Sequence, residues 1–207
     1  MRFEIISEGE TEKNSVAKFL KSWLDPRLSQ PVGIKVSDEK GFARALRKIS
    51  TKAKAKLEAP GNSEIIGVIG LIDLYGPEFP NHLTTVAERY EWFKEEVERD
   101  VDDERFRIHF AVHEVEAWLL SDKFIFPRPV QDIWPASLRP PEQVNFNEPP
   151  AKFLNKLYKS ATRKTYKKTV NGKQLFGKLD VSVAVDACPY LKLMLEDMLA
   201  MAKEKGL

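Results

Sequence analysis

The chain has 207 residues, of which 43% are hydrophobic and 31% are charged, a composition typical of a folded globular protein rather than a disordered one. No apolar run approaches the ~18 residues of a membrane-spanning helix, so we expect neither a membrane segment nor a signal peptide. Cys188 is the single cysteine, which excludes an intrachain disulfide and indicates a reducing, cytoplasmic compartment.

The net charge of +2 hides an uneven distribution of charge. The segment Pro149–Leu179 has nine Lys and Arg residues and no Asp or Glu, whereas Glu78–Glu104 has ten acidic residues and three basic ones. A basic segment of this kind attracts a polyanion such as nucleic acid. A solvated lysine-rich surface without a ligand gives the same pattern, so both interpretations stay open.

Strand and helix patterns alternate through the first part of the chain. In chain order, the apolar spacing predicts strands at 2–7, 32–36, 65–72 and 106–112, separated and followed by helices at 16–24, 42–56, 82–101 and 114–120. The nearly continuous apolar run Ile65–Ile72 is typical of a central strand that is covered on both faces. This alternation indicates βαβ crossovers and a mostly parallel sheet flanked by helices.

The last third of the chain has a different pattern. Seven prolines between 127 and 150 predict an irregular loop that wraps the surface, and helices are expected at 152–161 and 189–203. We therefore expect an α/β core at residues 1–125 and a helical, basic C-terminal extension at 126–207. The extension is expected to pack on the core as one unit.

Carboxylates fall at the expected carboxyl ends of three strands, where open α/β sheets bind ligands. Glu8 follows the first strand and Glu12 lies about one helical turn later, Asp73 ends the third strand, and Glu114 and Glu116 follow the fourth. Such carboxylates can converge on Mg²⁺ or Mn²⁺, which prefers oxygen ligands and lowers the pKa of an attacking water. Each carboxylate also has a structural alternative, as a helix-start residue or as a partner of Lys or Arg.

Other residues with potentially reactive side chains have simpler interpretations. His109, His113 and Cys188 are expected to pack in the interior. Tyr158 and Tyr166 either stack on the bases of a single strand or pack on the α/β core. No phosphate-binding glycine loop and no nucleophile elbow occur in the sequence, which argues against self-contained nucleotide binding and against a serine hydrolase.

The basic segment supplies the residues expected to hold a nucleic-acid backbone by sequence-independent, salt-sensitive contacts. They are Lys152, Lys156, Lys159, Arg163, Lys164, Lys167, Lys168 and Lys173.

Three stretches, Ile5–Glu12, Leu71–Asp73 and His113–Asp122, together resemble an uncharacterised Toprim-like family related to RloB-like proteins and to the Toprim part of OLD-type nucleases. The resemblance implies a Toprim-like (Rossmann-like) fold that binds Mg²⁺ and acts on phosphodiester bonds. It also implies an ABC-type ATPase as a separate partner chain in anti-phage defence.

The resemblance also assigns roles to single residues. Glu8 and Glu12 match the Glu-x-x-x-Glu of OLD-type nucleases, and Asp73 matches the first aspartate of an Asp-x-Asp pair. Tyr75 stands in the place of the second aspartate, so Glu116, with Glu114 behind it, is expected to complete the site.

Three functions follow as hypotheses. The first is a metal-dependent nuclease acting on DNA or RNA, with catalytic Glu8, Asp73 and Glu116 and with metal ligands drawn from Glu8, Glu12, Asp73, Glu114 and Glu116. The second is a catalytically degenerate subunit that binds nucleic acid or protein, suggested by the missing second aspartate. The third is a metal-dependent phosphatase of small molecules. The oligomeric state does not follow from the sequence.

Overall fold

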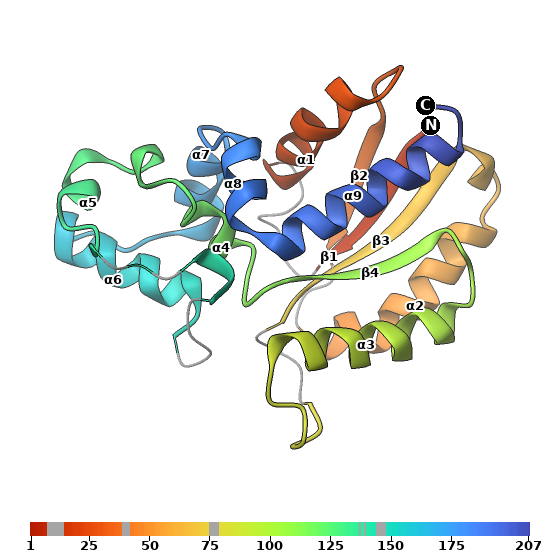
Figure 1. Cartoon of the computed structure of the whole chain (residues 1–207), viewed down its shortest axis with the longest axis horizontal. Coiled ribbons are helices and arrows are strands. Elements are labelled where there is room, and N and C mark those ends of the chain that lie inside the picture. Colours follow the sequence, from red (N-terminus) through yellow and green to blue (C-terminus); the bar gives the residue numbers. More distant parts are fainter. Residues whose placement is uncertain (8–14, 39–41, 75–78, 137, 139, 144–147) are drawn as a thin grey trace.

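Four parallel strands form one sheet in the order β2-β1-β3-β4. The computed structural model, shown in Figure 1, describes residues 1–7, 15–38, 42–74, 79–136, 138, 140–143 and 148–207. The strands are β1 (Arg2–Ser7), β2 (Gly33–Asp38), β3 (Ile65–Asp73) and β4 (Phe106–Ala111). The prediction of a parallel α/β sheet flanked by helices is therefore confirmed.

Helices cover both faces of this sheet (Figure 1). On one face lie α2 (Phe42–Glu58) and α3 (Val86–Val101), and on the other lie α1 (Ala17–Leu24) and α9 (Pro189–Glu204). Successive side chains of a strand point to opposite faces. Accordingly, Phe3 and Ile5 of β1 belong to the apolar core beneath α1 and α9, whereas Ile6 belongs to the core beneath α2 and α3.

The last helix, α9, returns to the sheet and packs on β3 and β4. Gly67 of β3 makes this close approach possible, because a Cβ atom at that position would clash with the side chain of Met201 on α9. The N- and C-termini consequently lie close together at the amino end of the sheet (Figure 1).

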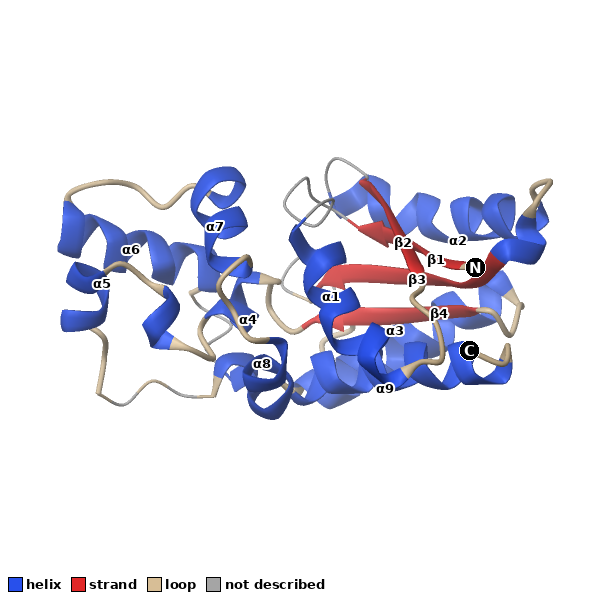
Figure 2. Ribbon diagram, turned by 90° about the horizontal axis from the view of Figure 1, so that it is seen from above, coloured by secondary structure: helices blue, strands red, loops and turns tan. Residues whose placement is uncertain are grey.

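The remaining helices form a lobe beyond the carboxyl ends of the strands (Figure 2). They are α4 (Glu116–Leu119), α5 (Arg128–Asp132), α6 (Pro150–Thr162), a π-helical turn (Lys168–Gly172), α7 (Lys173–Phe176) and α8 (Val181–Ala187). The rings of Trp118 in α4 and Phe19 in α1 stack with centroids 6.1 Å apart, and Phe176 in α7 packs edge-on against both rings. The lobe and the sheet therefore share one apolar core.

Some boundaries differ from the predicted ones. The helix expected from His82 begins at Val86, because Thr85 and Glu88 form a capping box that starts the helix there. The prediction of an unbroken irregular loop between 127 and 150 is wrong, since α5 lies within it. Pro129 fits the first turn of α5, where a helix needs no N–H donor from proline.

Several predicted interior residues are buried. His109, His113 and Cys188 are each at most 1% exposed. Tyr158 and Tyr166 are buried with ring centroids 5.5 Å apart, so packing, and not base stacking, is the correct alternative for them. Within the described residues, no helix is long and apolar enough to cross a membrane.

Candidate functional site

All four strands end at the edge of the sheet that faces the helical lobe (Figure 2). The strand register sets Ser7 beside both Asp38 and Leu71, and it sets Asp73 beside Ala111. The end of β3 therefore lies next to the end of β4. Two of the predicted site residues, Glu8 and Glu12, lie outside the described residues.

A strained turn follows β4 and directs the chain into α4. His113 has a φ of 70°, in the left-handed region that residues other than glycine seldom adopt. Burial lowers the pKa of His113, which keeps its imidazole neutral near pH 7. After this turn come Glu114, which is partly exposed, and Glu116, the fully buried first residue of α4.

A lysine from the lobe reaches into this turn. The Nζ atom of Lys168 lies 3.2 Å from Glu114 Oε1 and 3.1 Å from Glu116 Oε2. Lys168 begins the π-helical turn, a rare element that is frequent at functional sites. The lysine side chain is 41% exposed whereas that of Glu116 is 0% exposed, so the ammonium group lies between solvent and a buried carboxylate.

Three carboxylates of the described residues act on this lysine. Burial lowers the pKa of Lys168, but the carboxylates of Glu116, Asp73 and Glu114 outweigh that effect, and the pKa is raised above its ordinary value. The lysine therefore stays protonated at any physiological pH. We name Asp73, Glu114, Glu116 and Lys168 the acidic edge cluster: three carboxylates from two strand ends around one ammonium group.

A buried tyrosine borders the same cluster. Burial raises the pKa of Tyr166, and the charge of Glu116 raises it further, so its phenol stays protonated. Tyr166 is held through its backbone N–H, which donates to Asn155 Oδ1 at 3.2 Å. The cluster thus has an ammonium group and a neutral phenol beside its carboxylates.

Glu114 also has a structural role. Its second oxygen, Oε2, accepts a hydrogen bond from the backbone N–H of Ala151 at 2.8 Å, in the first turn of α6. Pro149 and Pro150 give that helix no side-chain cap, so the carboxylate of Glu114 supplies one from a distant segment and interacts favourably with the helix dipole. Because both of its oxygens are engaged, Glu114 is a weaker candidate for a metal ligand than Asp73 or Glu116.

The donor chemistry of Asp73 and Glu116 suits a hard divalent cation, because both supply carboxylate oxygens where negative charge is in excess. Within the described residues, however, no three His, Cys, Asp or Glu side chains are grouped closely enough to hold a metal ion. A complete metal site would need a further carboxylate. In the sequence, Glu8 directly follows Ser7, which ends β1 at this same edge.

The predicted nucleic-acid-binding residues divide into two groups. Those exposed to solvent are Lys152, Lys156, Lys159, Arg163, Lys164, Lys167 and Lys173, and we name them the basic surface. Among them, Lys156 forms an ion pair with Glu148. Lys168 departs from the prediction, because its ammonium group faces the carboxylates of the acidic edge cluster instead of joining this surface. Nothing in the local sequence distinguishes Lys168 from its neighbour Lys167.

Comparisons with known proteins give one family and one solved structure. A family model described as "Domain of unknown function (DUF4276)" matches residues 7–199. A search of curated proteins finds no significant match. The chain is similar to a solved structure titled "C-terminal region of the Burkholderia pseudomallei OLD protein", with 18% identity and a TM-score of 0.46, over 97% of this chain and 98% of that one.

Proposed function

The chain belongs to the DUF4276 family of domains of unknown function, and we propose that it is a nuclease of the Toprim type that depends on a divalent cation. The observation that carries this proposal is the acidic edge cluster, in which Glu114 and Glu116 pair with Lys168 and the charge of Asp73 acts on the same ammonium group. Ligands of open α/β sheets collect at this edge. Glu8, which directly follows the last residue of β1 in the sequence, is proposed as a further carboxylate of this site.

We assign the cation ligands to Asp73, Glu116 and Glu8, and we propose that Glu114 supports them and that Glu12 either supports them or binds a second ion. Mg²⁺ or Mn²⁺ bound there would polarise a phosphoryl oxygen and lower the pKa of an attacking water. Glu8 has an alternative role as the general base that accepts a proton from that water.

The side chains beside the carboxylates can act on the phosphodiester directly. The ammonium group of Lys168 can donate hydrogen bonds to a non-bridging phosphate oxygen, which gains negative charge as the bond breaks. Its raised pKa keeps it charged for this task. The phenol of Tyr166 stays protonated, so it adds no negative charge beside the carboxylates.

The basic surface would hold the nucleic-acid backbone. Its side chains are exposed on α6 and on the segment that follows, in the same lobe that contributes Lys168. Contacts between such side chains and phosphates give binding that is independent of sequence and weakens steeply with salt. From the resemblance to OLD-type nucleases, we further propose that a separate ABC-type ATPase controls cleavage in an anti-phage defence system.

The test is cleavage of labelled single-stranded DNA, double-stranded DNA and RNA in Mg²⁺ or Mn²⁺, with the chain alone and with any ATPase encoded beside it. We expect cleavage that Glu8→Ala and Asp73→Ala each abolish while the far-ultraviolet circular dichroism stays unchanged. Lys56→Met, which changes a charge at the opposite end of the sheet, is the matched control and should cleave normally. Cleavage that survives Asp73→Ala would overturn the proposal.

A second function, that of a regulatory subunit that binds without cutting, is favoured by two observations. Lys168 already neutralises part of the acidic edge cluster, and Tyr75 stands where the resemblance expects a second aspartate. This alternative predicts salt-sensitive nucleic-acid binding without cleavage under every condition. A phosphatase of small molecules would instead hydrolyse phosphomonoesters, with little effect of salt on substrate binding.

A further inference from the structure

A cavity of about 1070 Å³ lies between the proline-rich segment, the end of α4 and the start of α9. Its volume is slightly above the usual range of ~300–1,000 Å³ for small-molecule sites. His113 lines this cavity and directly precedes Glu114 of the acidic edge cluster. The turn that follows β4 therefore contributes a residue to the cavity and a residue to the cluster.

Two aromatic rings that line the cavity each pack against a buried aromatic ring. Trp134 packs against Phe126 with ring centroids 4.9 Å apart, and Tyr190 packs against Tyr90 with ring centroids 5.0 Å apart. Both Trp134 and Tyr190 line the cavity and both are partly exposed. Because the rings that support them are buried, the side chains of Trp134 and Tyr190 are held in place and would lose little conformational entropy on binding a ligand.

A buried carboxylate fixes the wall. Glu142 is 5% exposed and accepts hydrogen bonds from the backbone N–H groups of Tyr190 at 2.9 Å and Leu191 at 3.2 Å. This pair of bonds holds the proline-rich segment on the start of α9 and so keeps the two sides of the cavity at a set separation. Glu142 itself lines the cavity.

Polar side chains also belong to the lining. Among the described residues, Glu142 and Asp186 contribute acidic side chains and Lys123 contributes an ammonium group. The NH2 group of Gln131 donates to the carbonyl oxygens of Phe126 at 2.6 Å and Phe124 at 3.3 Å, which leaves the side-chain oxygen of Gln131 as an acceptor. A planar ligand with amino groups matches the two aromatic rings and these acceptors.

We propose that this cavity binds a purine or pyrimidine base, stacked on Trp134 or Tyr190. The assignment rests on the proposed nuclease function, in which the base would belong to a single-stranded substrate of that nuclease. Stacking on aromatic rings tolerates any base, because every base has a π-face. The base can come from a strand or from a free nucleoside, and the experiment separates the two sources.

The direct test is isothermal titration calorimetry on the full chain without divalent cations, using adenosine, adenosine monophosphate and inorganic phosphate. Adenosine should bind and inorganic phosphate should not. Trp134→Ala should weaken adenosine binding about tenfold or more. Phe124→Ala is the matched control, because that aromatic ring is 72% exposed and does not line the cavity.

A second variant distinguishes loss of adenosine binding from loss of the folded structure. Ala136→Trp adds volume from an exposed position in the cavity lining and should also weaken adenosine binding, with an unchanged melting temperature. The proposal is overturned if adenosine does not bind the unaltered chain, or if both variants bind it as well as Phe124→Ala does.

Two further results identify the source of the base and separate this inference from the nuclease proposal. If the base belongs to a nucleic-acid strand, a short single-stranded oligonucleotide should displace adenosine. Trp134→Ala should then raise the KM of cleavage more than it lowers kcat. A free nucleoside as source predicts adenosine binding that the oligonucleotide does not displace. Absence of cleavage with Trp134-dependent adenosine binding would remove the nuclease proposal alone, and cleavage without adenosine binding would remove the cavity proposal alone.

Discussion

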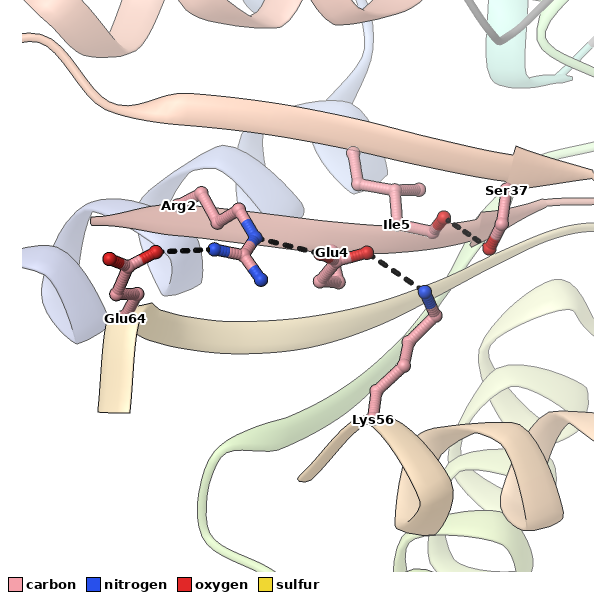
Figure 3. A network of polar contacts seen from close by, with 6 residues as sticks. All are labelled: Arg2, Glu4, Ile5, Ser37, Lys56 and Glu64. Carbon is pink, nitrogen blue, oxygen red and sulfur yellow. Dashed lines mark hydrogen bonds and ion pairs between the residues drawn. The ribbon is translucent and has the colours of Figure 1, made fainter. Parts of the chain in front are cut away.

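Two charged clusters lie at opposite ends of the same sheet and differ in their balance of charge. At the amino end of β1, the buried carboxylate of Glu4 forms ion pairs with Arg2 Nε and Lys56 Nζ, each at 2.8 Å (Figure 3). Arg2 also forms an ion pair with the exposed Glu64. At the carboxyl end, the single ammonium group of Lys168 faces the carboxylates of the acidic edge cluster.

The two clusters differ in the charges that act on their central group. Burial raises the pKa of Glu4, but hydrogen bonds from Arg2 and Lys56 and the charge of Lys35 lower it more. Among the described residues, cations therefore dominate around Glu4, whereas three carboxylates act on the ammonium group of Lys168. A titratable group perturbed by several carboxylates at a ligand-binding edge is a candidate for a functional site.

The largest expected effect is on catalysis at the carboxyl end. Asp73→Asn and Glu116→Gln should each lower cleavage more than about a hundredfold, since changes in groups around metal ligands alone cost ~10–100-fold. Steady-state cleavage of a labelled strand measures this. Equal activity in Asp73→Asn and in the Lys56→Met control would remove the distinction between the two ends.

Lys168→Met tests how much the ammonium group of Lys168 stabilises the acidic edge cluster. Removing the ammonium group from beside Glu116 should destabilise the fold by about 3 kcal/mol, because the buried carboxylate loses a charged partner. Added Mg²⁺ should restore part of that loss, because a ligand that binds only the folded state stabilises it by mass action. Urea unfolding with and without Mg²⁺ measures both. An equal Mg²⁺ effect on Lys56→Met would show that the recovery is not specific to the acidic edge cluster.

Glu142 is a buried carboxylate whose oxygens accept hydrogen bonds from the backbone N–H groups of Tyr190 and Leu191. Burial raises its pKa to about 7, so the folded state binds a proton more tightly than the unfolded one. The free energy of unfolding should therefore fall as pH rises from about 5 to about 7, by ~2 kcal/mol from this group.

The measurement is urea unfolding across this pH range for the unaltered chain and for Glu142→Gln, which should lose that part of the slope. Glu204→Gln, at the exposed end of α9, is the control. An identical slope in the unaltered chain and in Glu142→Gln would refute the assignment.

The smallest expected effect belongs to the balanced cluster. Lys56→Met removes a charge-assisted hydrogen bond to Glu4 but leaves Arg2 in place, so it should lower the free energy of unfolding by only about 1.5–3 kcal/mol. Cleavage should be unchanged. A loss of activity without a loss of stability would give the amino end a role that the charge balance does not predict.

The sheet could be predicted from the sequence because its information is local. The apolar run of β3 is long enough to be recognised as a buried strand. The apolar residues of α1 and α9 recur at helical spacing over at least two turns. The helices α7 and α8 were not predicted, because four to seven residues span too few turns to show a helical period.

The site could be predicted only in part, because local sequence patterns mark some of its residues but not their long-range contacts. Strand ends mark Asp73, Glu114 and Glu116 in the sequence, and the fold brings them to one edge, although their roles remain predictions. The placement of Lys168 was missed, because its partners lie 52 and 54 residues away and only tertiary packing selects it over Lys167. The capping of α6 by Glu114 is equally long-range.

The central claim is that the carboxyl edge of the sheet binds a divalent cation through Asp73 and Glu116. Titration of Mn²⁺ into the full chain, followed by the electron paramagnetic resonance signal of free Mn²⁺, tests it most directly. The account predicts bound Mn²⁺ in the unaltered chain and in Lys56→Met, and its loss in Asp73→Asn and Glu116→Gln. Equal Mn²⁺ binding by all four proteins, or none by the unaltered chain, would contradict it.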